Sequence, residues 1–129
     1  AKLAISLAII RLVGRRFLQG EQPLGKTEIA QSLGVPAPAV EACLSNLVAV
    51  GLLNQIKQAE EKKNEKHYQP SSDPQRITFE NVYQKLNTLG DAPNYSQASE
   101  DLSLVHGKLV EYRKLMHQHP MSQPIVDWD

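Results

Sequence analysis

The chain has very little of several things that small functional domains often use. It has one cysteine, Cys43, among 129 residues. One thiol excludes an internal disulfide, and it excludes iron–sulfur clusters and structural zinc sites that draw several thiolates from one chain. Charge of one sign is also missing, because 14 basic residues balance 14 acidic ones. The net charge therefore predicts no general attraction to nucleic acid or anionic lipid.

Long hydrophobic runs are missing as well. The longest apolar stretch, residues 3–13, is interrupted by Ser6 and is far shorter than the ~20 residues that cross a bilayer. No signal peptide is evident. Because an apolar segment starts almost at Ala1, we interpret the chain as a fragment of a longer protein. Its length suits one compact domain, or one domain with a helical appendage, and excludes a multidomain enzyme.

What the chain does contain is a clear order of secondary-structure signals. Apolar residues at three- and four-residue spacing predict helices, and glycines and prolines mark their ends. Short apolar runs with little helical spacing predict strands. The predicted elements are a first helix ending at Gly20, helices over 26–33 and about 38–50, strands around 52–56 and 67–69, a fourth helix over about 79–89 and a last helix over about 99–118.

This order of three helices, a strand, a wing and a second strand is typical of a winged helix-turn-helix. We therefore predict a mostly α fold with a small β-hairpin, a winged helix-turn-helix with additional C-terminal helices. The predicted boundaries are a winged-helix domain over 1–90 with its wing at about 57–67, a linker over 91–98, a C-terminal helix over 99–118 and a flexible tail over 119–129.

A set of short motifs runs through the predicted winged-helix region. They are Arg15-Arg16-Phe17, Gly20-Glu21-Gln22-Pro23-Leu24, Glu28-Ile29-Ala30, Leu33-Gly34-Val35-Pro36 and, after the wing, Tyr68-Gln69-Pro70, Asp73-Pro74, Ile77-Thr78-Phe79 and Val82. Over about residues 3–87 these motifs resemble the cytoplasmic C-terminal region of the YihY/BrkB family of inner-membrane proteins, formerly labelled ribonuclease BN. The later motifs are also similar to redox-sensing winged-helix repressors.

The resemblance carries implications about the parent protein. It implies a six-helix membrane portion upstream and a position on the cytoplasmic side of the inner membrane, with this fragment itself soluble. Arg11, Arg15 and Arg16 would then follow the membrane exit, as the positive-inside bias predicts. The ribonuclease label of the family finds no residues in this chain onto which an activity could be carried.

DNA binding is the usual role of this fold, but the predicted recognition helix has few residues suited to it. Such helices contact bases and phosphates through Arg, Lys, Asn or Gln near their start. The helix over 38–50 has no basic residue and carries Glu41. The weak candidates for nucleic-acid contact are Arg11, Arg15, Arg16, Lys26, Lys62 and Lys63. We therefore do not expect sequence-specific DNA binding.

Catalytic and metal sites are not predicted either. His117 and His119 form the only close histidine pair, and residues two apart on a helix point to different faces. The sequence contains no glycine-rich phosphate loop and no dinucleotide fingerprint. We expect no catalytic activity, no cofactor, no metal and no small-molecule site.

The last predicted helix carries one narrow apolar stripe at alternating three- and four-residue steps. This apolar stripe consists of Leu102, Val105, Leu109, Tyr112 and Met116. It can pack on the first helix of the same chain, on a second copy, or on another protein. We interpret the chain as a cytosolic interaction or regulatory domain of a larger, membrane-embedded protein that binds a protein partner or itself. The alternatives are a DNA-binding transcriptional regulator and part of a ribonuclease BN-like protein in RNA processing.

Overall fold

A computed structural model describes residues 2–57, 66–88, 99–119 and 122–129 of the chain. Its elements follow the predicted order closely, and α2 begins and ends where its spacing and Gly34 predict. Most of the predicted wing and the predicted linker lie outside the described residues. The elements are α1 (Lys2–Leu18), β1 (Leu24–Gly25), α2 (Lys26–Leu33), α3 (Ala37–Ala49), β2 (Leu53–Ile56), β3 (His67–Pro70), η1 (Pro74–Arg76), α4 (Phe79–Asn87), α5 (Glu100–His117) and η4 (Ile125–Asp127).

The fold is mostly helical with a small antiparallel sheet, the winged helix-turn-helix that the sequence predicts. The sheet has three strands rather than two, in the order β1-β3-β2. The added strand is β1, where Leu24 pairs with Tyr68 and Gly25 with His67. Because β1 is only two residues long, it shows no alternation of apolar and polar residues that could have predicted it.

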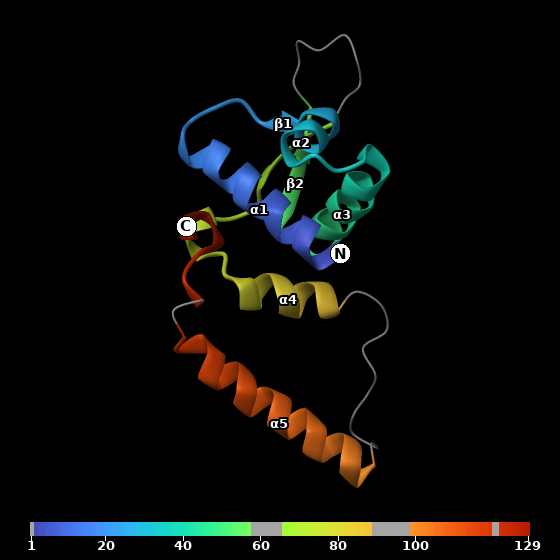
Figure 1. The fold of residues 1–129 in the computed structure, drawn as a ribbon, viewed down its shortest axis with the longest axis vertical. Helices are drawn as coiled ribbons and strands as arrows, with labels where there is room; N and C mark the ends of the chain where they lie inside the picture. Colours follow the sequence, from blue (N-terminus) through green and yellow to red (C-terminus); the bar gives the residue numbers. More distant parts are fainter. Residues whose placement is uncertain (1, 58–65, 89–98, 120–121) are drawn as a thin grey trace.

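The core lies where α1 crosses α3 and the sheet. Helix α1 buries Ile9, Ile10 and Val13 and packs against α3, β3 and η4. Helix α3 buries Val40, Leu44 and Leu47 toward the same centre. Buried apolar side chains from α2, from both hairpin strands and from the C-terminal segment complete one continuous cluster. Figure 1 shows the helix-turn-helix at one end of the molecule and α5 at the other, with α4 between them.

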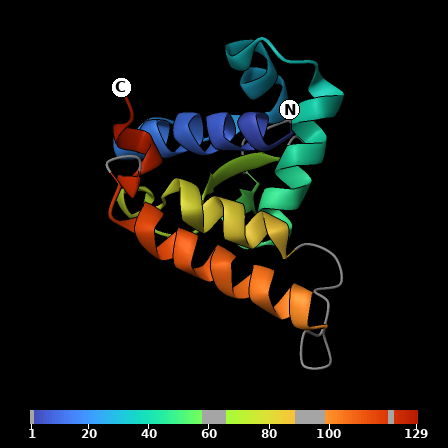
Figure 2. The ribbon, with the colours of Figure 1, turned by 60° about the horizontal axis from the view of Figure 1, so that its bottom comes forward.

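The C-terminal residues differ from the flexible tail expected over 119–129. Residues 122–129 return to α1, where Ile125 and Val126 are buried. Backbone bonding fixes them, since the Ile125 N–H donates to the Ile77 carbonyl at 2.9 Å. The returning segment therefore belongs to the core of the winged-helix unit. Figure 2 shows η4 beside α1, and α5 alongside α4.

Candidate nucleic-acid interface

The turn between α2 and α3 sets the angle at which α3 is presented. Gly34 ends α2 in the left-handed conformation, with φ 67° and ψ 35°, which a glycine adopts without strain. The Val35 N–H donates to the Ala30 carbonyl at 3.1 Å. Pro36 then caps α3 with φ −57°, and a second proline, Pro38, occupies its first turn. These local constraints hold the two helices in the geometry of a helix-turn-helix.

The side chains on the outer face of α3 are mostly small or polar. Because Val40, Leu44 and Leu47 are buried, the opposite side of the helix faces outward. It exposes Glu41 and Ser45, with Ala42 and Asn46 half-buried at its edges. Small side chains allow a helix to approach base edges closely, and Ser, Asn and the alanine methyl can each contact bases in the major groove.

The negative charge of Glu41 is paired. Lys26 Nζ, at the start of α2, lies 3.5 Å from Glu41 Oε2. Burial raises the pKa of the Tyr68 phenol above its ordinary value of 10.0, and the negative charge of Glu41 adds to that rise. The one carboxylate on the outer face of α3 is therefore paired with a lysine of α2.

Two lysines lie at the base of the wing, and neither is among the candidates predicted from the sequence. The last paired residues of the hairpin are Ile56 and His67. Lys57 follows Ile56, Lys66 precedes His67, and both lysines are exposed. The register of the strands brings these two lysines together. The predicted candidates Lys62 and Lys63 lie outside the described residues.

The arginines of α1 face away from this surface. Arg11 Nη2 donates to the Trp128 carbonyl at 3.0 Å, and Arg15 Nε donates to the Val126 carbonyl at 3.0 Å. Arg16 forms an ion pair with Glu21. Figure 1 shows that the C-terminal half of α1, which carries them, runs away from α3 toward the chain's C-terminus. These three candidates hold the fold together, and Lys26 alone of the described candidates lies beside α3.

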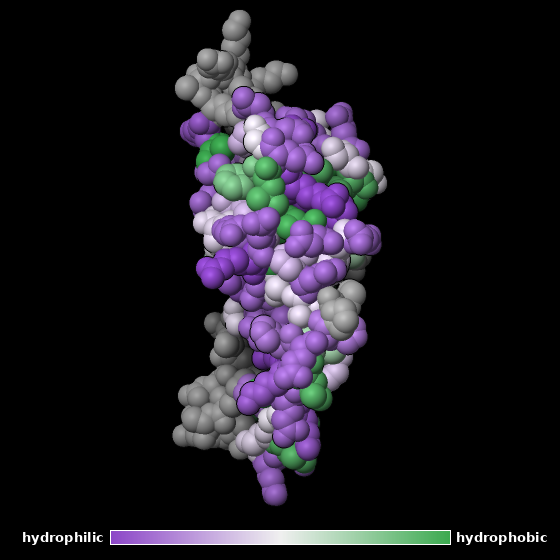
Figure 3. Space-filling view, turned by 90° about the vertical axis from the view of Figure 1, so that its left-hand side faces the viewer, coloured by the Kyte–Doolittle hydropathy of each residue, from purple (hydrophilic) through white to green (hydrophobic). Residues whose placement is uncertain are grey.

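The apolar stripe on α5 is not covered by the first helix. Every residue of α5 is described, and none is buried. Leu109, at the middle of the stripe, is 50% exposed and Tyr112 is 62% exposed. Helix α5 meets α4 instead, along hollows that both helices line. Figure 3 shows a largely hydrophilic face on which apolar side chains in the lower part gather toward one edge.

The described residues contain neither a metal-binding cluster nor a membrane-spanning helix. Across residues 2–57, 66–88, 99–119 and 122–129, no three His, Cys, Asp or Glu side chains are grouped so that they could hold a metal ion. Within the same residues, no helix combines the length and apolar character needed to cross a bilayer.

Comparison with known proteins adds evidence on the helix-turn-helix. A family model described as the IclR helix-turn-helix domain matches residues 3–57, which span α1, the turn and the first hairpin strand. A search of curated proteins gives no match.

Solved structures are similar over nearly the whole chain. One is CymR (YrzC), the global cysteine regulator of B. subtilis, with 20% identity and a TM-score of 0.65, covering 98% of this chain and 92% of that one. IscR of T. potens has 17% identity and a TM-score of 0.66, covering 98% and 82%. CymR of Staphylococcus aureus has 14% identity and a TM-score of 0.62, covering 99% and 97%. At these identities the similarity shows the fold, which is the winged helix.

These findings correct the resemblance to the YihY/BrkB family. The matching model is a helix-turn-helix domain, and the similar structures are CymR and IscR. The motifs that suggested the membrane family encode a turn and a core that winged helices share, so they were not diagnostic. The expectations that depended on it were therefore wrong: the membrane-embedded parent, the position at the inner membrane and the ribonuclease BN connection.

The expectation against sequence-specific DNA binding is corrected by the same match. That expectation gave weight to the lack of a basic residue on α3 and to the acidic Glu41. It took no account of the pairing between Lys26 and Glu41.

Proposed function

We propose that this protein is a DNA-binding transcriptional regulator whose α3 enters the major groove. The observation that carries the proposal is the outward presentation of α3 on a rigid helix-turn-helix, within the segment that matches a helix-turn-helix domain. In this proposal, Ser45 contacts base edges and the alanines of α3 allow close approach. We also propose that α5 forms an arm between α4 and the C-terminal segment that returns to the winged-helix core.

Phosphate contacts come from the base of the wing. Lys57 and Lys66 flank the paired part of the hairpin, and such contacts position a protein on DNA without selecting sequence. One copy offers few cations, whereas proteins with strong salt dependence make 6–10 phosphate contacts. Two copies bound side by side would double the number of cations and of base-contacting helices.

A second copy is the occupant that we propose for the apolar stripe. An 18-residue helix without a buried residue is marginal alone in water, and α5 leaves Leu102, Val105 and Leu109 exposed. Its first turn carries acidic residues and its last turn basic ones. Two copies of α5 packed antiparallel bring opposite charges together and give the two-fold symmetry usual for dimers.

The test places a negative charge on the outer face of α3. Ser45→Asp should weaken binding to the protein's preferred duplex at least tenfold, because the carboxylate would face bases and phosphates. Ser103→Asp is the matched control, since Ser103 is also exposed but lies on α5. Fluorescence anisotropy titrations measure both. Equal affinity of Ser45→Asp and the unsubstituted protein would refute the placement of α3 in the groove.

A further inference from the structure

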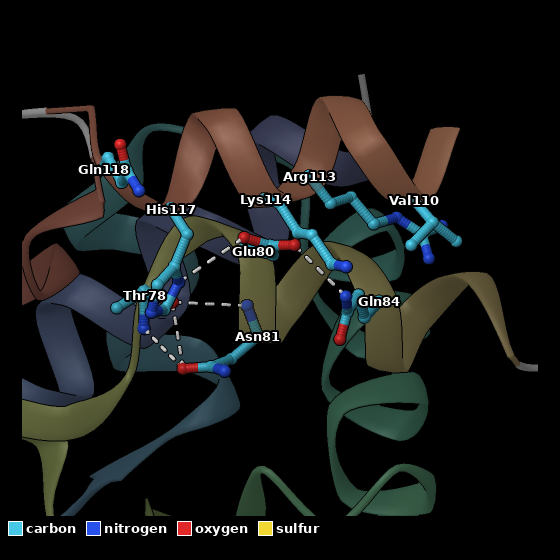
Figure 4. A pocket seen from close by; sticks show the side chains of 9 residues that line it. All are labelled: Thr78, Glu80, Asn81, Gln84, Val110, Arg113, Lys114, His117 and Gln118. Carbon is cyan, nitrogen blue, oxygen red and sulfur yellow. Dashed lines mark hydrogen bonds and ion pairs between the residues drawn. The ribbon is translucent and has the colours of Figure 1, made fainter. Parts of the chain in front are cut away.

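A second hollow between α4 and α5 is lined by charged and polar side chains. It has a volume of about 590 Å³, which lies within the range of small-molecule sites. The N-cap Thr78 and helix α4 contribute Thr78, Glu80, Asn81 and Gln84, and the facing helix contributes Val110, Arg113, Lys114 and His117. Figure 4 shows Lys114 and His117 reaching from α5 toward Glu80 and Gln84 of α4, with Arg113 beside Val110.

The four side chains from α5 lie on one helical face. Arg113, Lys114 and His117 follow Val110 by three, four and seven residues, which places them on the side of α5 that meets α4. In the apolar stripe, Leu109, Tyr112 and Met116 line a neighbouring and mainly apolar hollow, and Glu80 and Arg113 line both hollows. Helix α5 therefore presents an apolar side and a cationic side along its contact with α4.

The charge in the polar hollow is unbalanced. Among the described residues that line it, Glu80 is the one carboxylate. Glu80 Oε1 accepts from Gln84 Nε2 at 3.2 Å, and Oε2 lies 3.8 Å from His117 Nδ1. Among the described residues, no carboxylate forms an ion pair with Arg113 or Lys114. Within one copy, the described lining of the hollow therefore carries Arg113 and Lys114 against the single carboxylate of Glu80, an excess of positive charge.

Hydrogen-bonding groups surround these cations. Asn81 Oδ1 accepts from the Thr78 N–H at 3.0 Å and from Thr78 Oγ1 at 2.9 Å, which fixes the orientation of the Asn81 side chain and leaves its amide N–H groups as donors. The hollow also lies at the N-terminal turn of the nine-residue α4, whose dipole favours negative charge. Charge, donors and dipole all favour the same kind of ligand.

We propose that this polar hollow binds a small organic anion that carries carboxylate or phosphate groups. The Arg113 guanidinium can bind a carboxylate or phosphate through two parallel hydrogen bonds, and Lys114 supplies a point charge beside it. Val110 and the methylene stems of the cations cover the apolar part of the ligand. The ligand bridges α4 and α5 and so fixes the C-terminal helix on the winged-helix body.

The test is isothermal titration calorimetry on the full chain, with citrate and inorganic pyrophosphate as separate probes at constant ionic strength. We expect saturable one-site binding of at least one probe. Binding of citrate alone assigns a carboxylate ligand, and binding of pyrophosphate alone assigns a phosphate ligand. Because the assay contains no DNA, its outcome is independent of the proposed function.

Substitutions locate the binding. Arg113→Gln and Lys114→Gln should each weaken it at least tenfold. Lys108→Gln removes the same charge from the same helix, but Lys108 pairs with Glu111 at 3.6 Å and lies outside the hollow, so affinity should be unchanged. Circular dichroism verifies that each variant stays folded. No saturable binding of either probe, or equal weakening by Lys108→Gln and Arg113→Gln, would overturn the proposal.

Discussion

At the scale of single residues, Gly14 shows why α1 needs a glycine in its middle. A Cβ at this position would lie 2.7 Å from Val126 Cγ1 and 3.2 Å from Pro74 Cβ. Both neighbours are stiff, so α1 and the C-terminal segment would have to move apart. Gly14 therefore allows α1 to pack closely against the C-terminal segment, which is far from it in the sequence.

Gly14→Ala should lower the free energy of unfolding by about 1–3 kcal/mol, the usual cost of overpacking a core. Gly107→Ala is the control, because a Cβ on Gly107 would meet nothing within 4 Å; it should be neutral, or stabilise α5 by up to about 1 kcal/mol. Urea denaturation measures both. If Gly14→Ala is as stable as Gly107→Ala, the C-terminal segment does not pack on α1 as described.

Glu41 is the residue whose charge should limit DNA affinity. Glu41→Gln removes the acid from the outer face of α3 and releases Lys26 to contact phosphate, so affinity should rise severalfold, and more at low salt. Glu111→Gln is the matched control, since it removes a carboxylate that also pairs with an exposed lysine, at 3.6 Å, but on α5. Anisotropy at two salt concentrations measures the difference. A fall in affinity for Glu41→Gln would mean that Glu41 itself contacts the DNA.

Single residues were predictable only where their partners are near in sequence. The helix over 26–33 was expected to end at a glycine, and Gly34 ends α2 through bonds to the carbonyls of Ala30 and Gln31. The roles of Arg11 and Arg15 could not be predicted, because their carbonyl partners lie 117 and 111 residues away. No local pattern encodes such a contact, so exposed cations with a structural role were taken for candidates for nucleic-acid binding.

At the scale of elements, the returning C-terminal segment is the clearest departure from the sequence analysis. Pro120 and the polar residues around it suggested a tail, whereas Ile125 and Val126 are buried and the Trp128 carbonyl accepts from Arg11. The apolar residues that anchor it are too few to form a periodic pattern. Their burial depends on the groove that α1 and η1 provide.

Truncation after Pro124 should destabilise the fold by about 3–6 kcal/mol, since burying each apolar side chain contributes roughly 1.5–3 kcal/mol. Removing only Asp129, which is exposed, should leave stability unchanged. The free energy of unfolding from urea titration gives the comparison. A truncated chain as stable as the full one would show that this segment is not part of the core.

The apolar stripe on α5 gives the test for self-association. Leu109→Asp should convert a dimer into a folded monomer, because a carboxylate would be buried at the centre of the proposed contact. Leu104→Asp is the control, since Leu104 is exposed but lies on a different face of α5. Light scattering measures the mass. A monomeric unsubstituted protein, or a dimer that survives Leu109→Asp, would contradict the proposed contact.

Helices were predictable to within a few residues because their ends are set locally. Gly34 ends α2, and the capping box between Thr78 and Asn81 starts α4. Strand β1 was missed because it exists only through its pairing with β3. The hollows between α4 and α5 were missed for the same reason, since they depend on how two helices meet rather than on either sequence.

At the scale of the whole molecule, the fold was predictable and the function was misjudged. The order of elements suffices for a winged helix, and the solved structures agree with it. The function was inferred from formal charge on α3 and from turn motifs that many winged helices share. Neither takes account of Lys57 and Lys66 beside each other at the hairpin, or of the paired Glu41.

The proposed architecture has two symmetric halves. If two copies join through α5, their α3 helices are related by a two-fold axis. Each α3 then contacts one half-site, and the two half-sites have the same base sequence on opposite strands. The DNA site should then be an inverted repeat with half-sites about one helical turn, roughly 34–36 Å, apart or a multiple of that spacing. This links the self-association of α5 to the sequence that α3 selects.

The most direct test of the central claim is selection of bound duplexes from a pool of random sequence, at physiological salt, with the full chain. The account predicts that one inverted repeat is enriched, and that its affinity exceeds that of shuffled duplex by about 10³-fold or more. Sequences that remain random after repeated rounds, with affinity no better than that for shuffled duplex, would contradict it.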